Sequence, residues 1–203
     1  MKLYVIRHGQ TDWNRARRLQ GRSDIPLNEW GRKVAELTRE GLKDVKFDVA
    51  FTSPLCRAKE TAKIILKGRD LPIIEEPRMI EVNFGGYEGE SFDLEDENLQ
   101  YFFSKPECYR SVKGSETMQS IMDRVGAFYE DLVRNPAYQD STVLISTHGA
   151  ALSALLCHIK GWPVCDFWKG GLHKNCGLSI VEVRDGNAEI LEEATLVYDE
   201  SKL

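Results

Sequence analysis

The chain has 203 residues, of which 42% are hydrophobic and 29% charged, and its 27 basic and 32 acidic side chains give a net charge of -5. A chain of this length forms a substantial core as one domain, and the acidic balance disfavours a nucleic-acid partner. No apolar run reaches the length of a membrane span. No secretory leader precedes the first strand-like run, and the five cysteines lack paired spacing. We therefore expect a cytoplasmic protein with free thiols that binds neither nucleic acid nor membrane.

Short apolar runs alternate with helical patterns along the chain. The predicted elements are a strand at 2–6, a helix at 27–45, a strand at 47–53, a helix at 54–68, strands at 71–76 and 141–147 that enclose a helix at 115–135, a helix at 149–161 and a hairpin at 178–194. Asn28 is the predicted N-cap of the first helix. Residues 79–104 are rich in glycine and acid and are predicted to be irregular. This order indicates an α/β sandwich with a mostly parallel sheet and a late antiparallel edge.

Polar residues follow three of the predicted strands at the point where each strand ends. These segments are Arg7-His8-Gly9, Thr52-Ser53 with Arg57 one turn later, and Thr147-His148-Gly149. Ligands of open α/β sheets bind beyond the carboxyl ends of the strands, so we expect the three segments to share one rim. Guanidinium groups suit phosphate oxygens, and a neutral imidazole is a nucleophile. The pattern predicts phosphoryl transfer through a phosphorylated histidine.

Six motifs appear in the order found in a known family. They are "RHGQTDWN" (7–14), "QGRSDIPLNEWGR" (20–32), "TSPLCRAKETA" (52–62), "MIEVNFGGYEG" (79–89), "GSETMQSIMDRV" (114–125) and "STHGA" (146–150). The chain thereby resembles the histidine phosphatase superfamily, the phosphoglycerate mutase-like proteins. The resemblance implies a three-layer α/β/α fold and a reaction without metal or other cofactor. It also implies a single domain over 1–203, with residues 79–110 as a candidate lid or insertion over the site.

The resemblance assigns a role to each site residue. His8 corresponds to the nucleophile, and Glu81 corresponds to the acid that protonates the leaving group and then activates water; Glu88 is the alternative acid. The catalytic set is His8, Glu81, Arg7, Arg57 and His148. Substrate contacts are expected from Arg7, Asn14, Gln20, Gly21, Arg57, His148 and Gly149.

The family contains both phosphatases and mutases. A mutase holds a doubly phosphorylated species, yet no Lys or Arg lies between Arg78 and Lys105, where seven acidic residues accumulate. We therefore expect hydrolysis of a small phosphorylated metabolite by a metal-independent histidine acid-type phosphatase. Phosphoglycerate mutase is the alternative, and an inactive protein that binds a phosphorylated ligand is a further one. Three aromatic residues after the acid (Phe84, Tyr87, Phe92) suggest a partly apolar leaving group.

Other clusters have simpler interpretations. The basic stretch 15–22 is interpreted as a solvated loop that attracts anions. A zinc site is disfavoured because the spacing of its candidate ligands is irregular; these are Cys157, His158, Cys165, His173 and Cys176. The apolar residues Trp162, Phe167 and Trp168 belong either to the core or to the interface of a candidate homodimer.

Overall fold

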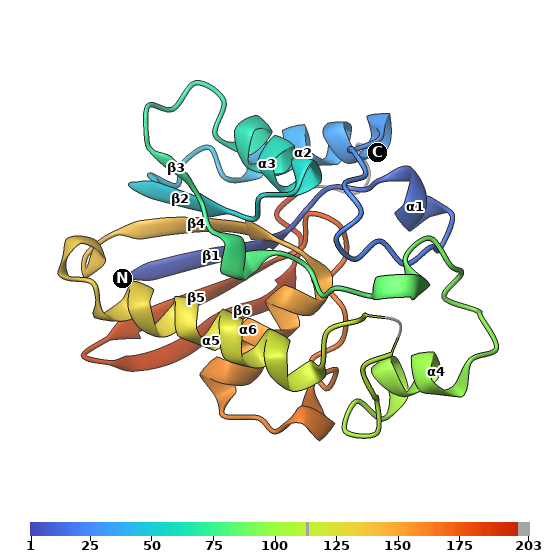
Figure 1. Cartoon of the computed structure of the whole chain (residues 1–203). Helices are drawn as coiled ribbons and strands as arrows, with labels where there is room; N and C mark the ends of the chain where they lie inside the picture. Colours follow the sequence, from blue (N-terminus) through green and yellow to red (C-terminus); the bar gives the residue numbers. More distant parts are fainter. Residues whose placement is uncertain (113, 199–203) are drawn as a thin grey trace.

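The computed structural model describes residues 1–112 and 114–198 and contains one six-stranded sheet. Its elements in chain order are β1 (Lys2–Arg7), α1 (Asp12–Arg15), α2 (Glu29–Gly41), β2 (Val49–Thr52), α3 (Cys56–Ile65), β3 (Ile73–Glu75), α4 (Glu97–Ser104), α5 (Met118–Arg134), β4 (Thr142–Thr147), α6 (Gly149–Lys160), β5 (Leu178–Arg184) and β6 (Asn187–Thr195). Figure 1 shows α2 and α3 on one face of the sheet and α5 and α6 on the other. The expected three-layer α/β/α arrangement is confirmed.

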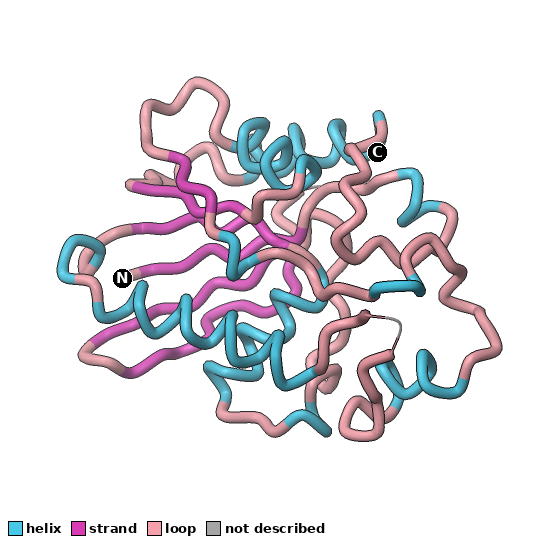
Figure 2. Tube along the Cα trace, in the orientation of Figure 1, coloured by secondary structure: helices cyan, strands magenta, loops and turns pink. Residues whose placement is uncertain are grey.

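The strands follow the order β3-β2-β4-β1-β5-β6 (Figure 2). The first four strands are parallel, whereas β5 and β6 form an antiparallel edge. Because β4 lies between β2 and β1, the carboxyl ends of these three strands are neighbours. The register pairs Ser146 with both Ile6 and Thr52, which places the segments after these strands along one rim.

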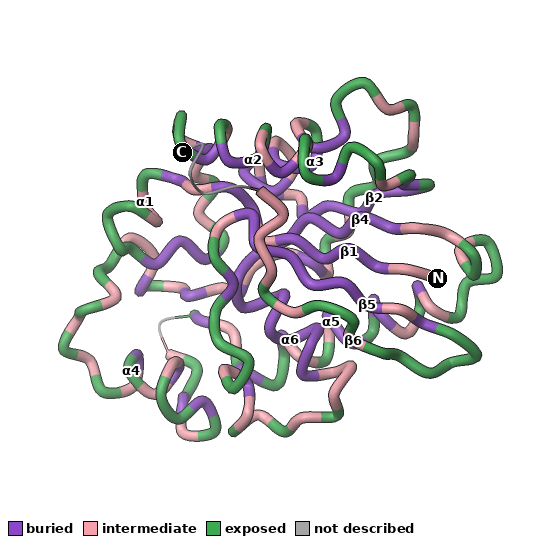
Figure 3. The backbone as a smooth tube through the Cα atoms, turned by 180° about the vertical axis from the view of Figure 1, so that it is seen from behind, coloured by how far each residue is buried: buried purple, intermediate pink, exposed green. Residues whose placement is uncertain are grey.

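Alternate side chains of the central strands enter different cores. In β1, Leu3 and Val5 belong to the core under α5 and α6, whereas Tyr4 and Ile6 belong to the core under α2 and α3. Both faces are covered, so β1 and β4 are buried along most of their length (Figure 3). An uninterrupted apolar run is what such a strand requires, and it brings His8 and His148 to the ends of rigid elements.

Two short helices were not predicted. The segment 79–104 is not irregular throughout, because α4 occupies Glu97–Ser104. Its N-cap Asp96 accepts a hydrogen bond from the Leu99 amide, and Leu99 and Phe102 are its two buried residues. Two buried positions in eight residues are too few for a recognisable helical period. The other, α1, has four residues and is held by hydrogen bonds between Thr11 and Asn14.

The described helices include none that is both long and apolar enough to cross a membrane.

The loop that follows β1 is seated directly on the start of α2. The amide of Asn28, the N-cap of α2, donates to the Gln10 carbonyl at 3.0 Å. A Cβ atom at Gly31 would lie 2.1 Å from the Gln10 carbonyl oxygen, and one at Gly9 would lie 2.7 Å from the Gly31 carbonyl oxygen. The two backbones can approach this closely because both positions are glycine. The close contact fixes the position of the loop that carries His8.

We predict that Gly31→Ala lowers the free energy of unfolding by about 1–3 kcal/mol, because the new methyl group forces the loop and the helix apart. The loss is expected even though alanine is the better helix former. Urea unfolding followed by circular dichroism measures it. Glu36→Ala on the exposed face of α2 is the control, expected within about 0.5 kcal/mol of the wild type. Equal stabilities of the two variants would contradict the prediction.

Candidate active site

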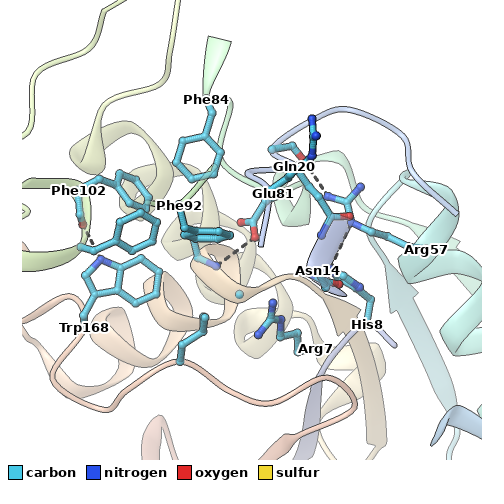
Figure 4. A pocket seen from close by; sticks show the side chains of 16 residues that line it. Arg7, His8, Asn14, Gln20, Arg57, Glu81, Phe84, Phe92, Phe102 and Trp168 are labelled. Atoms are coloured by element: carbon cyan, nitrogen blue, oxygen red, sulfur yellow. Dashed lines mark hydrogen bonds between the residues drawn. The ribbon is translucent and has the colours of Figure 1, made fainter. Parts of the chain in front are cut away.

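A cleft of about 450 Å³, partly open to solvent, lies at the rim formed by β1, β2 and β4. Its lining residues are Arg7, His8, Asn14, Arg18, Gln20, Gly21, Arg57, Glu81, Phe84, Phe92, Phe102, Phe103, Gly149, Ala150, Trp168 and Leu172. Eight of the nine residues predicted for the site are in this set. The ninth, His148, lies beside His8, with 5.1 Å between the ring centroids. Figure 4 shows the polar group around His8 on one side of Glu81 and the aromatic group on the other.

The imidazole of His8 is held in one tautomer. Its Nδ1 lies 2.6 Å from the Gly9 carbonyl oxygen and therefore donates, while its Nε2 accepts from Arg57 Nε at 3.3 Å. Burial, together with the positive charges of Arg57 and Arg7, lowers the pKa of His8 well below 6.5. Nε2 is therefore the nitrogen whose lone pair can act as a nucleophile when its 3.3 Å contact with Arg57 is released.

Arg57 is fully buried and joins three segments of the chain. Besides its contact with His8, its Nη1 donates to the Ser23 carbonyl at 2.8 Å and its Nη2 donates to the Gly21 carbonyl at 2.7 Å. Burial lowers the pKa of Arg57 to about 10, which still leaves the group cationic at neutral pH. The side chain therefore positions both the nucleophile and the loop at residues 20–23.

Two buried nitrogens near His8 have no hydrogen-bond partner: Arg7 Nε and His148 Nδ1 are the only such side-chain atoms among the described residues. His148 Nε2 lies 2.6 Å from Ser53 Oγ, which also accepts from the Leu55 amide at 3.3 Å. When the Ser53 hydroxyl donates its proton to Nε2, the proton of the neutral ring lies on Nδ1. In that tautomer, Arg7 Nε and His148 Nδ1 each present an N–H donor that the protein leaves unused.

Ser53 received no role from the sequence, although it was placed on the rim. A serine directly after a strand that ends beside a histidine-bearing strand is the signal that points to it. Its hydroxyl group is hydrogen-bonded to His148 Nε2 at 2.6 Å.

The carboxylate of Glu81 lines the cleft and lies at the N-terminus of α6. Its oxygens accept from the amides of Ala150 at 3.2 Å and Ala151 at 3.1 Å. Its backbone carbonyl accepts from Arg124, which is itself bound to Glu116. The side chain is thus fixed at both ends.

Glu88, the alternative acid, has a structural position instead. It does not line the cleft. Its carboxylate accepts from the amides of Arg22 and Ser23, both at 2.8 Å, from the Ser23 hydroxyl, and from the Phe84 amide at 3.3 Å. Four donors engage both of its oxygens and tie residues 22–23 to residues 84–88. The geometry therefore favours Glu81 as the acid.

Asn14 and Gln20 present amide nitrogens to the cleft. The side-chain oxygen of Asn14 accepts from the Thr11 amide at 3.1 Å and from Asn175 at 3.3 Å, and that of Gln20 accepts from the Thr11 hydroxyl at 2.8 Å. With both oxygens engaged inside the protein, the NH₂ groups are the parts left for a ligand. Thr11 and Asn175 orient these groups and had no role in the sequence analysis.

The side of the cleft away from His8 is aromatic. Phe84 and Phe92 were anticipated there, but Phe102, Phe103 and Trp168 were not. The Trp168 indole N–H donates to the Phe102 carbonyl at 2.6 Å, and the Phe92 and Phe103 rings lie 5.3 Å apart. Phe102 and Phe103 belong to α4, and Trp168 belongs to the segment after α6. No local sequence motif indicated that these three residues line the cleft.

Tyr87 was expected among these aromatic residues, and this expectation was wrong. Its side chain is buried in the core, and its hydroxyl donates to Asp96 at 2.9 Å. The 3-10 turn Gly85–Tyr87 directs it away from the cleft.

The five residues considered for zinc have separate surroundings. Cys157 contacts the Phe167 carbonyl, and His173 is bound to Ser179 at 2.7 Å. In residues 1–112 and 114–198, no three His, Cys, Asp or Glu side chains are grouped as ligands for a metal ion.

Comparison with known proteins gives a match to the family described as Histidine phosphatase superfamily (branch 1), over residues 3–194. The chain belongs to this superfamily. It is 40% identical over 157 residues to the "Uncharacterized phosphatase PhoE" of Bacillus subtilis (strain 168), covering 77% of this chain and 76% of that protein. It is 33% identical over 189 residues to the "Probable phosphoglycerate mutase GpmB" of Yersinia pestis (strain Pestoides F), covering 91% of this chain and 86% of that protein.

The structure of this chain is similar to the solved structure of Bacillus stearothermophilus YhfR. The TM-score is 0.89 at 31% sequence identity, with 97% of this chain and 98% of that chain covered. The superfamily and its named relatives support phosphatase or mutase activity.

We predict that His8 stays neutral as the pH falls through 6.5, where a free imidazole takes up a proton. Protonation would place a third positive charge on a buried side chain beside Arg57 and Arg7. The unfolded chain does bind this proton, so His8 makes the folded state less stable as the pH drops below 6.5. Nitrogen-15 NMR of labelled histidine measures the titration.

The matched variants are Arg57→Gln and Arg17→Gln. The first removes a charge next to His8 and should raise its pKa towards 6.5. The second removes an exposed arginine that is paired with Asp93 and should leave the titration unchanged. A wild-type His8 that titrates near pH 6.5 would refute the electrostatic argument.

Proposed function

We propose that the protein is a phosphatase that hydrolyses a small-molecule phosphomonoester through a phosphohistidine at His8. The observation that carries this proposal is the direction of the donors: a lone pair on His8 Nε2 lies among the cationic groups of Arg7 and Arg57 and the N–H of His148. A phosphoryl group there would have its equatorial oxygens surrounded by preset donors, which stabilises the charge of the transition state.

In the first step His8 Nε2 attacks phosphorus, the phosphorus–oxygen bond to the alcohol breaks, and Glu81 gives its proton to the leaving oxygen. In the second step water attacks the phosphohistidine while Glu81 takes a proton from that water, which releases phosphate and restores both residues. The arginines supply the positive charge that a metal supplies in other phosphatases, so the proposed reaction is metal-independent. Asn14 and Gln20 contribute further donors to the phosphoryl oxygens.

Hydrolysis is favoured over mutase activity by the composition of the cleft. A mutase must bind phosphate at both ends of its substrate, whereas the part of the cleft away from His8 is lined here mainly by phenylalanine and tryptophan side chains, with Arg18 as its single cation. These rings fit a partly apolar leaving group better than a second phosphate. Phosphoglycerate mutase remains the second candidate because a relative with that name is 33% identical. An assay of phosphoglycerate interconversion, with phosphate release measured alongside, separates the two; rapid isomerisation with little phosphate release would favour the mutase.

We predict that rapid quenching during turnover of a phosphomonoester traps an acid-labile, base-stable phosphoryl group on His8. Peptide mapping after labelling with phosphorus-32 locates it. His8→Ala should lose the label and at least about a thousandfold of the rate, because the nucleophile is absent. His158→Ala is the matched control, since His158 lies on α6 and is bound to Glu130 away from the cleft. A label that persists in His8→Ala would overturn the proposal.

We predict that the loss of kcat/KM caused by Glu81→Gln depends on the leaving group of the substrate. With alkyl phosphates, kcat/KM should fall about 10²–10⁴-fold, because the departing alkoxide needs a proton. With 4-nitrophenyl phosphate, whose phenolate departs without one, the loss should be much smaller. Steady-state kinetics with both esters measures this difference.

Glu88→Gln tests the alternative acid in the same assay. It should lower stability, because it weakens the four contacts of the carboxylate, without making the loss of rate depend on the leaving group. A dependence that follows Glu88 instead of Glu81 would reverse the assignment.

A further inference from the structure

Four arginines lie in the basic stretch 15–22, and three of them are paired with carboxylates. The pairs are Arg15 with Asp12 at 3.1 Å, Arg17 with Asp93 at 3.0 Å and Arg22 with Glu116 at 3.3 Å. The fourth, Arg18, has no carboxylate partner among the described residues and is the one that lines the cleft. The stretch as a whole is therefore not simply a solvated basic loop, because one of its four cations faces a ligand cavity.

The backbone around Arg18 is fixed against the far wall of the cleft. Residues 17–19 pair with residues 89–92: the Gly89 amide donates to Leu19, the Leu19 amide to Glu90 and the Phe92 amide to Arg17, at 2.8–2.9 Å. Arg18 Nη1 also donates to the Gly89 carbonyl at 3.1 Å. A cation held in this way loses little freedom when it binds an anion.

The charges that line the cleft are Arg7, Arg57, Glu81 and Arg18. Arg7 and Arg57 adjoin His8 and serve the phosphoryl group, and Glu81 accepts from the start of α6. Arg18 lines the same cleft as the aromatic residues, and its guanidinium is bound to the Gly89 carbonyl, in the segment that also bears Phe92. A ligand that fills this part of the cleft meets apolar rings and one unpaired guanidinium.

We propose that Arg18 binds a carboxylate on the leaving group, so that the preferred substrates are phosphomonoesters whose alcohol or phenol carries an apolar body and a carboxylate. This inference rests on the proposed function. A guanidinium pairs with carboxylate oxygens in a planar, charge-assisted contact. One guanidinium that already donates to a backbone carbonyl carries a single charge, which matches a carboxylate better than a second, dianionic phosphate.

The test compares two esters of the same shape: 4-carboxyphenyl phosphate and 4-carbamoylphenyl phosphate, with the 3-substituted pair to sample a second direction. The measured quantity is the ratio of kcat/KM for the carboxylate to that for the carboxamide, at low ionic strength. Arg18→Gln should lower this ratio about tenfold, chiefly by raising KM for the carboxylate; the effect is no larger because the arginine is exposed to solvent. Arg18→Lys should retain part of the preference for the carboxylate.

Arg17→Gln is the matched control, because Arg17 is the adjacent exposed arginine, does not line the cleft and is paired with Asp93. Its ratio should stay within about twofold of the wild type. Dissociation constants of the same esters are measured in the His8→Ala background, with and without Arg18→Gln, by calorimetry. There the preference for the carboxylate should again fall about tenfold.

The outcomes separate the inference from the function on which it rests. A ratio unchanged by Arg18→Gln, in turnover and in binding, overturns the role of Arg18 while phosphate release still supports a phosphatase. If wild-type protein releases phosphate from neither ester but His8→Ala loses its carboxylate preference with Arg18→Gln, the proposed function fails and the recognition of a carboxylate stands.

Discussion

The guanidinium of Arg57 lies fully buried and makes three donations to two parts of the chain: one to the His8 imidazole, and two to the carbonyls of Gly21 and Ser23 in the loop at residues 20–23. A charge removed from water in this way is tolerated only when its donors are used. The same contacts determine which nitrogen of His8 has the lone pair and where the loop at residues 20–23 lies. The geometry of the cleft around His8 therefore depends on one buried side chain whose donors must all be used.

Those parts of the structure that depend on short-range pattern were predictable. Continuous apolar runs identified β1 and β4, and the rule that parallel strands end at one edge brought Arg7, His8 and His148 together before any coordinates were known. The glycines at 9 and 31 could be seen in the sequence, but their mutual approach could not, because it is a property of two backbones packed across 22 residues.

The remainder of the cleft is assembled from distant or chemically equivalent residues. Glu81 and Glu88 are the same side chain seven positions apart, and only the four donors around Glu88 distinguish them. The aromatic wall joins α4 to Trp168, separated by more than sixty residues, through one indole-to-carbonyl contact. Arg18 differs from its neighbours Arg15, Arg17 and Arg22 in lining the cleft and in having no acidic partner among the described residues, and a sequence displays neither property. In each case the deciding quantity is a hydrogen bond or ion pair formed after the chain has folded.

The position of β1 in the sheet also affects how the protein is made. This strand is the first in the sequence, yet its neighbours are β4 and β5, which lie between residues 142 and 184. Pairings of such long sequence separation form slowly, because the intervening chain must first be brought together. During synthesis on the ribosome the strand that leads to His8 emerges early, before either of its partner strands has been made. The rim that gathers Arg7, His8 and His148 is therefore completed only when the last third of the chain has been synthesised.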